Sequence, residues 1–270
     1  MRNDQPAVGE PSRGSPGPVV FARFGYPPNA LGYCGPADPA GFLGAAAEGT
    51  DLATVSALAA RFDGAWPYLQ LIAACNGISD PLDARVVDAY WIGNPLLEQV
   101  PALALVANLD ERFERRAGRD FSSVAEAALL GGAAHHSFHV FAVYPWLGLL
   151  RAGMDRAPLV VLDQCRVRWG TVLAVEGDLA VVSSRALVLD GHVLAEGPER
   201  VEQVRASVDG VGFGQDLVAG DRVALHWDWV CERLSPNALA RLTTWTRRTL
   251  QAVNALPAPG PAVACDTRGG

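Results

Sequence analysis

The hydrophobic pattern of this chain changes its period near Pro158, and that change limits the folds open to it. Before this point, as in residues 51–62, apolar side chains recur at helical spacing. After it, short Val-rich runs alternate with turn signals such as Asp190-Gly191, which is typical of strands. The sequence therefore predicts an α+β protein, in which an all-helical N-terminal domain precedes a small antiparallel, OB-like β-barrel with a C-terminal helix.

These patterns divide the 270-residue chain into four parts. Residues 1–19 and 257–270 are rich in Pro and Gly, and we expect a disordered leader and a loose tail. We expect the helical domain over 20–157 and the barrel with its helix over 158–256. The last helix before the barrel should run from about His135 to Arg151, with a kink at Pro145. The expected strands cover 160–162, 171–175, 179–183, 186–189, 193–194 and 222–227.

Composition narrows the class of partner. Half of the residues are apolar, which is enough for a sizeable core, and the net charge is −7. An acidic chain is a poor ligand for phosphate backbones, so we expect no nucleic-acid partner. The longest apolar stretch, 138–150, is shorter than the roughly 20 residues of a membrane helix, and the first residues lack the apolar run of a secretory signal. We therefore expect a soluble, cytoplasmic protein without a membrane partner.

Five cysteines, odd in number and widely spaced, form no CxxC pair. This spacing disfavours both a disulfide framework and a zinc ribbon, so we expect reduced, unpaired thiols. Packing roles are expected for Cys75 and Cys231, and Cys265 lies in the tail. Cys165 and Cys34 remain as candidates for chemistry.

The segment from Asp163 to Asn254 carries an ordered set of short motifs. Cys165 is followed by a G-T-V run, then an A-V-V strand, then a G-D-x-V-x-L-H strand that ends at His226, and finally a helix that starts near Pro236. This order resembles the HypC/HupF family of [NiFe]-hydrogenase maturation chaperones. The motifs that carry the resemblance are Cys165, Gly170-Thr171-Val172, Gly177, Ala180-Val181-Val182, Gly220-Asp221, Val223, Leu225 and His226.

The resemblance implies a metal site and a partner. In that family a Cys and a His bind an iron atom that carries cyanide and carbon monoxide, together with the protein HypD. Cys165 would then be the thiolate ligand of the iron and His226 the second ligand, and thiolate sulfur is a suitable soft donor for such iron. The implied function is that of an accessory or chaperone protein, whose partner is a HypD-like maturation protein or the hydrogenase large subunit. Both residues should lie close together in the folded protein.

The N-terminal region offers a second set of candidates for cofactor binding. Cys34 lies in a Gly/Pro/aromatic loop over 24–36, which is either a rigid packed loop or one that presents a reactive thiol. In the sequence H-H-S-F-H, His135 and His139 share one helix face, as metal-ligand pairs do, while His136 lies between them. Histidines at a helix start also bond to backbone or solvent, so both interpretations stay open.

Two other functions remain open. The helical domain could be a thiol- or metal-dependent enzyme with the barrel as a carrier arm, or the whole chain could be a structural adaptor without metal. The sequence contains no P-loop, no G-x-G-x-x-G after a strand and no G-x-S-x-G, so no catalytic residue is assigned.

Overall fold

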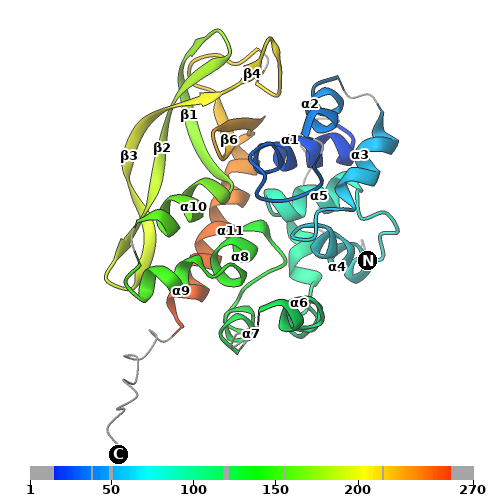
Figure 1. Cartoon of the computed structure of the whole chain (residues 1–270), viewed down its shortest axis with the longest axis vertical. Helices are drawn as coiled ribbons and strands as arrows, with labels where there is room; N and C mark the ends of the chain where they lie inside the picture. Colours follow the sequence, from blue (N-terminus) through cyan, green and yellow to red (C-terminus); the bar gives the residue numbers. More distant parts are fainter. Residues whose placement is uncertain are drawn as a thin grey trace, which may run out of the picture.

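The protein is α+β, with a helical region beside a five-stranded sheet and a long C-terminal helix between them (Figure 1). This confirms the predicted fold class at that level. The computed structural model describes residues 15–37, 39–48, 51–117, 122–154, 156–214 and 216–256. The expected tail over 257–270 and most of the expected leader lie outside these ranges.

The helical region starts earlier than expected. Helix α1 begins at Gly17, so the last residues of the predicted leader are part of it. Pro18 suits the first turn of a helix, and Gly17 is required because a Cβ there would lie 1.8 Å from the carbonyl oxygen of Leu82. The elements of this region are α1 (Gly17–Ala30), α2 (Pro39–Glu48), α3 (Leu52–Ala59), α4 (Trp66–Cys75), α5 (Ala84–Trp91), the 3-10 helix η1 (Pro95–Gln99), α6 (Ala102–Ala117) and α7 (Ser122–Leu129).

Three short pieces replace the single kinked helix predicted before the sheet. They are α8 (His136–Phe138), the π-helix η2 (His139–Val143) and α9 (Trp146–Arg151). The break falls at Tyr144, which is extended because the ring of Pro145 disfavours a helical conformation for the residue before it.

The predicted strand over 160–162 is wrong, because these residues belong to helix α10 (Ala157–Cys165). Pro158 lies in the first turn of this helix. Pro158, Leu162 and Cys165 are buried, and their spacing of four and three residues is that of one helix face. A short apolar run fits either a strand or a helix. Here the helical spacing of the buried residues on both sides of the run shows that it is part of a helix. The sheet therefore begins only at Arg168.

The sheet comprises β1 (Arg168–Glu176), β2 (Leu179–Asp190), β3 (Val193–Arg205), β6 (Arg222–His226) and β7 (Trp229–Arg233). They pair in the order β1-β2-β3-β7-β6, and β6 pairs back onto β1. Four contacts are antiparallel, but β3 and β7 run parallel through one pair, Arg205 and Trp229. The prediction of a wholly antiparallel arrangement is therefore wrong, because an odd number of strands that pair in a ring cannot alternate in direction throughout. Two further strands, β4 (Ser207–Val208) and β5 (Val211–Gly212), form a separate small sheet.

One hydrophobic cluster joins the helices to the sheet. It includes Phe21 of α1, Leu162 of α10, Leu194 of β3 and Leu242 of the C-terminal helix α11 (Pro236–Asn254). Ser235 caps α11 by accepting a hydrogen bond from the backbone N–H of Ala238 at 3.1 Å. A smaller cluster fills the inside of the sheet, with Val172, Val182, Val204, Val223 and Val230 among its members.

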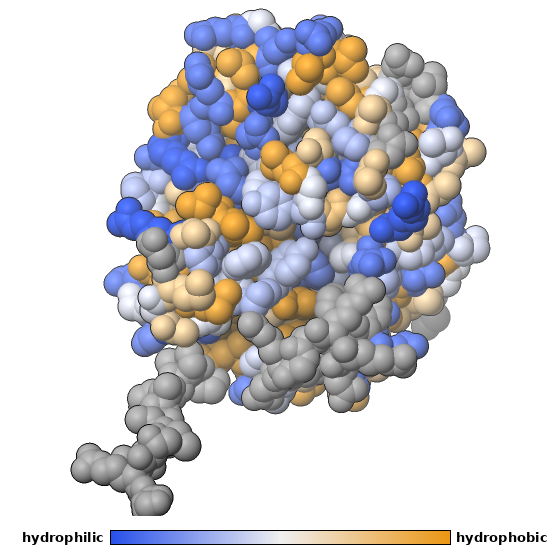
Figure 2. All heavy atoms as spheres, in the orientation of Figure 1, coloured by the Kyte–Doolittle hydropathy of each residue, from blue (hydrophilic) through white to orange (hydrophobic). Residues whose placement is uncertain are grey.

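The surface mixes polar and apolar side chains on the face that Figure 2 shows. A cavity of about 550 Å³ lies between α9, α10 and β2, with Leu159 and Leu187 among its apolar lining and Asp163 and Arg200 as charged members. None of the helices within the described ranges has the length and apolar character needed to cross a membrane.

Candidate metal centre

Three buried side chains, His136, Cys165 and His226, converge where the helices meet the sheet. One potential ligand atom from each lies within 4.8 Å of the others. His136 is the first residue of α8, Cys165 the last of α10 and His226 the last of β6. The structure thus brings together the two residues that the sequence singles out as metal ligands, and adds a third. We refer to these three residues as the His–Cys–His cluster.

Backbone turns place the cluster residues. Helix α10 ends at Cys165 because Arg166 is extended, and β6 ends at His226 because Trp227 takes a positive φ of 55°. The backbone N–H of Trp227 donates to the carbonyl oxygen of Gln164 at 2.8 Å, which ties the end of β6 to the end of α10. Positive φ is strained for a bulky residue and often marks functional turns.

His226 has one nitrogen fixed and one free. Its Nδ1 lies 2.7 Å from the carbonyl oxygen of Phe24, and because a carbonyl only accepts, Nδ1 must carry the proton. Nε2 then has a lone pair, is buried and makes no well-formed hydrogen bond among the described residues, although the backbone of Cys165 lies close enough to the ring to raise its pKa. Burial, and then the nearby His136, hold the pKa of His226 well below its usual range. The ring is therefore neutral at pH 7 and can donate the Nε2 lone pair to a metal.

His136 has both nitrogens engaged. Nε2 lies 2.8 Å from the carbonyl oxygen of Cys165, and Nδ1 lies 3.2 Å from the hydroxyl of Tyr90. Burial lowers the pKa of His136 to about 4, so it too is neutral at pH 7. Its ring packs edge-on against that of His226, with 5.0 Å between the centroids.

Cys165 is buried, and this burial, followed by the charge of Cys34, raises the pKa of its thiol. Without a cation the sulfur is thus protonated, and metal binding would displace that proton. Burial also raises the pKa of the half-buried Cys34 to about 12. Cys34 is close enough to influence Cys165, although it is not a member of the cluster.

The loop that carries Cys34 is fixed against the turn after His226. Tyr33 stacks on Trp227, with 4.3 Å between ring centroids. The side-chain amide of Asn29 donates to the carbonyl oxygens of Cys34 and Pro36 at 2.9 and 2.5 Å. This is the packed loop of the first sequence interpretation, and it places a second thiol beside the cluster.

The predicted pair His135 and His139 lies outside the cluster. Nδ1 of His135 accepts from the backbone N–H of Ser137 at 3.2 Å and so caps α8. Nδ1 of His139 lies 3.2 Å from the hydroxyl of Tyr68. Their spacing places these two on one face only if a single continuous helix runs through both. The helix begins only at His136, and no local signal in the sequence marks that residue as the one that faces Cys165.

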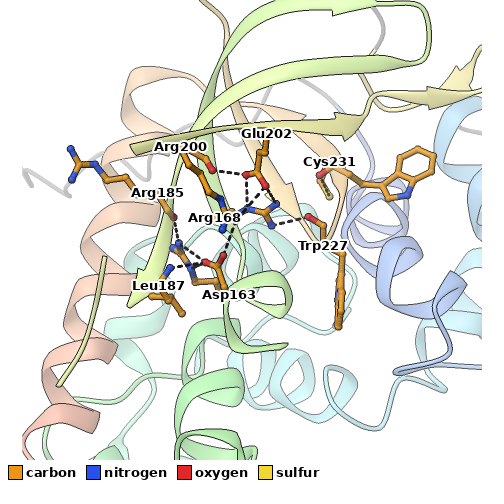
Figure 3. A network of polar contacts seen from close by, with 11 residues as sticks. Asp163, Arg168, Arg185, Leu187, Arg200, Glu202, Trp227 and Cys231 are labelled. Atoms are coloured by element: carbon orange, nitrogen blue, oxygen red, sulfur yellow. Dashed lines mark hydrogen bonds and ion pairs between the residues drawn. The ribbon is translucent and has the colours of Figure 1, made fainter. Parts of the chain in front are cut away.

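A buried ionic network flanks the cluster (Figure 3). The guanidinium of Arg168 donates to the carbonyl oxygen of Trp227 at 2.7 Å and pairs with Glu202 at 3.1 Å. Asp163 pairs with Arg166 at 3.2 Å and with Arg200 at 2.8 Å. Three arginines thus face two carboxylates. Arg166 directly follows Cys165 in the chain, so these ion pairs anchor the backbone next to the cluster.

The fold and the cluster define an α+β protein with a buried site of two imidazoles and one thiol. Residues 13–259 match a family of unknown function, DUF6390, and the chain belongs to that family. No curated protein and no solved structure is similar enough to match.

Proposed function

We propose that this protein is an accessory protein of [NiFe]-hydrogenase maturation, and that its His–Cys–His cluster holds the iron fragment with its cyanide and carbon monoxide ligands. The observation that carries the proposal is the convergence of Cys165, His226 and His136 in a buried place. Nε2 of His226 supports it further, because this buried nitrogen keeps its lone pair without a well-formed hydrogen bond.

The donor set fits such a cargo. One thiolate and two neutral imidazoles suit a transition metal such as iron better than a hard cation such as calcium. Three protein ligands leave positions for the diatomic ligands, which the iron would bring with it as cargo. The carbonyl of Phe24 orients His226, as outer-shell acceptors do for histidine ligands in metal sites.

The sheet supports the family assignment behind this proposal. Its pairing order returns to β1, and the matched motifs fall on β1, β2, β6 and α11 in the order of the HypC-like pattern. We propose that the sheet with α11 is an OB-like, HypC-like barrel, and that the partner is a HypD-like protein or the hydrogenase large subunit.

A thiol- or metal-dependent enzyme is the second candidate. Two tyrosine–histidine pairs, Tyr90–His136 and Tyr68–His139, lie in the same buried region. Such pairs can move protons during catalysis. Turnover that depends on Cys34 or His139 would favour this candidate over a carrier. A protein that carries no iron when purified with its partners would favour the adaptor.

The test is anaerobic purification of the protein with its maturation partners, followed by iron analysis and infrared spectroscopy. The proposal predicts iron and the bands of bound cyanide and carbon monoxide. Cys165→Ala should abolish the bands and leave the fold intact. Cys75→Ala, which removes a half-buried thiol of α4 outside the cluster, should leave them unchanged. Bands that survive Cys165→Ala, or a complex without iron, would refute the proposal.

A further inference from the structure

We infer that Tyr90 is a positioning residue that lets His136 switch between two tautomers. His136 is then the ligand that binds and releases the metal, while His226 keeps its proton on Nδ1 and a lone pair on Nε2 throughout. This inference rests on the proposed metal centre. It concerns how the site binds its metal. It follows from which ring nitrogen of each histidine must carry the proton, given the hydrogen bonds around the two rings.

The metal-free state of His136 is fixed by its two partners. The Cys165 carbonyl can only accept, so the Nε2 that lies 2.8 Å from it carries the ring proton. A neutral imidazole has one proton, so Nδ1 is an acceptor. The hydroxyl of Tyr90, 3.2 Å away, must therefore donate to Nδ1. In this state neither nitrogen has a lone pair available for a metal.

Metal binding requires the opposite tautomer. Nδ1 faces Tyr90, so Nε2, on the side of Cys165, is the nitrogen that can bind. Nε2 must lose its proton and Nδ1 must gain one, so that Nδ1 then donates to the Tyr90 oxygen. The Tyr90 hydroxyl proton can then turn to the carbonyl oxygen of Gly64, which lies 3.3 Å from that oxygen. The two ring nitrogens face opposite sides of the imidazole, so the Nε2 proton leaves to water, Tyr90 passes its proton to Nδ1, and water returns a proton to the Tyr90 oxygen. His136 and Tyr90 each hold one proton before and after the change, so the protons balance. Metal binding breaks the hydrogen bond from Nε2 to the Cys165 carbonyl, and this loss opposes metal binding.

A hydroxyl is the group that this switch requires. It can donate to Nδ1 in one state and accept from it in the other, whereas a carbonyl or carboxylate only accepts. Tyr90 is buried, and its ring packs against Tyr68 and Trp91 with centroids 5.6 and 4.7 Å apart, so it stays within reach of His136. The carbonyl of Phe24, by contrast, holds His226 in a single tautomer with Nε2 free. The two histidines of the cluster thus differ in whether their tautomer can change: that of His136 can, and that of His226 cannot.

The test uses the full chain with ¹⁵N-labelled histidine and zinc(II) alone as the probe. In the metal-free protein, the nitrogen shifts of His136 should report a protonated Nε2. After zinc is added they should report a protonated Nδ1, while His226 keeps its proton on Nδ1 in both states. Zinc bound with the proton of His136 still on Nε2 would overturn the switch.

Tyr90→Phe is the informative variant. It should weaken zinc binding by about 10–100-fold, the usual effect of losing an outer-shell partner. The metal-free tautomer of His136 should stay the same, because the Cys165 carbonyl still requires the proton on Nε2. Tyr68→Phe is the matched control, because its hydroxyl lies 3.2 Å from a ring nitrogen of His139, outside the cluster. It should leave both readouts unchanged. If Tyr90→Phe proves unstable, the tautomers of the unmodified protein still decide the matter.

The outcomes separate this inference from the proposed function. If Cys165→Ala binds zinc as tightly as the unmodified protein, the metal centre is wrong and the switch fails with it. If Cys165→Ala loses zinc while Tyr90→Phe keeps full affinity, the metal centre stands and only the switch is overturned.

Discussion

The helical and sheet regions contribute to the His–Cys–His cluster in different ways. On the sheet side, buried ion pairs such as Arg168–Glu202 hold the backbone next to Cys165 and His226. On the helical side, the partners of His136 are neutral, and Tyr90 can reverse its hydrogen bond. We propose that one half holds Cys165 and His226 rigidly, while Tyr90 makes the other half, with the third cluster residue His136, adjustable. The two halves are also interdependent, because the carbonyl that orients His226 belongs to Phe24 of α1.

The largest expected effect comes from the rigid half. Cys165→Ala removes the one anionic donor of the cluster, so stoichiometric binding of zinc(II) should be lost, as measured by calorimetry. His136→Ala should weaken binding without abolishing it, because Cys165 and His226 still converge. Equal loss in both variants would contradict the division into fixed and adjustable ligands.

Stability should respond strongly to the buried network beside the fixed ligands. Arg168→Met removes one partner of Glu202, which keeps its ion pair with Arg200 at 3.3 Å, and leaves the Trp227 carbonyl unpaired, so it should cost about 1–3 kcal/mol in the free energy of unfolding. Arg205→Met, which breaks the exposed pair with Asp228 at 3.2 Å, should cost less than about 1 kcal/mol. Chemical denaturation measures both. Similar costs in the two variants would show that the network does not hold this half rigid.

The adjustable half should make the metal-free protein sensitive to mild acid. His136 has a pKa of about 4 in the folded state and an ordinary value of 6.5. Below pH 6.5 the unfolded chain therefore binds a proton that the folded protein excludes, and stability falls with falling pH. Between pH 6.5 and 5 the loss from this residue is about 1.6 kcal/mol, because the limiting slope of about 1.36 kcal/mol per pH unit is reached only below pH 6.5.

Denaturant titrations of metal-free protein at these two pH values, repeated with His136→Gln, check this. The variant should lose less stability over the same interval than the unmodified protein. Identical losses would mean that His136 does not stay neutral in the folded state.

The smallest expected effect is at Cys34. It lies beside the cluster without belonging to it, so Cys34→Ser should change the affinity for zinc(II) by less than about tenfold, or 1.4 kcal/mol. A loss comparable to that of Cys165→Ala would make Cys34 a ligand and revive the N-terminal cofactor site that the sequence indicates.

Sequence patterns could predict the fold class and the convergence of two of the three cluster residues, Cys165 and His226. The change of period near Pro158 predicts helices followed by strands, and motif order links Cys165 to His226. The strand predicted over 160–162 is wrong because a short apolar run has no period of its own. The parallel contact between β3 and β7 depends on how the ring of strands closes, which local spacing does not encode.

His136 could not be singled out for a similar reason. Its role depends on where α8 begins and on the packing of that helix against the end of α10. The fixed tautomer of His226 likewise depends on a backbone carbonyl that is 202 positions away in the chain. Hydrogen-bond partners of this kind follow from tertiary structure and leave no mark in a single sequence.

X-ray absorption spectroscopy at the iron edge, on protein purified anaerobically with its maturation partners, tests the central claim most directly. The account predicts bound iron whose protein ligands are one sulfur and two imidazole nitrogens, with the sulfur contribution lost in Cys165→Ala. Iron without a sulfur ligand, or no iron at all, would contradict it.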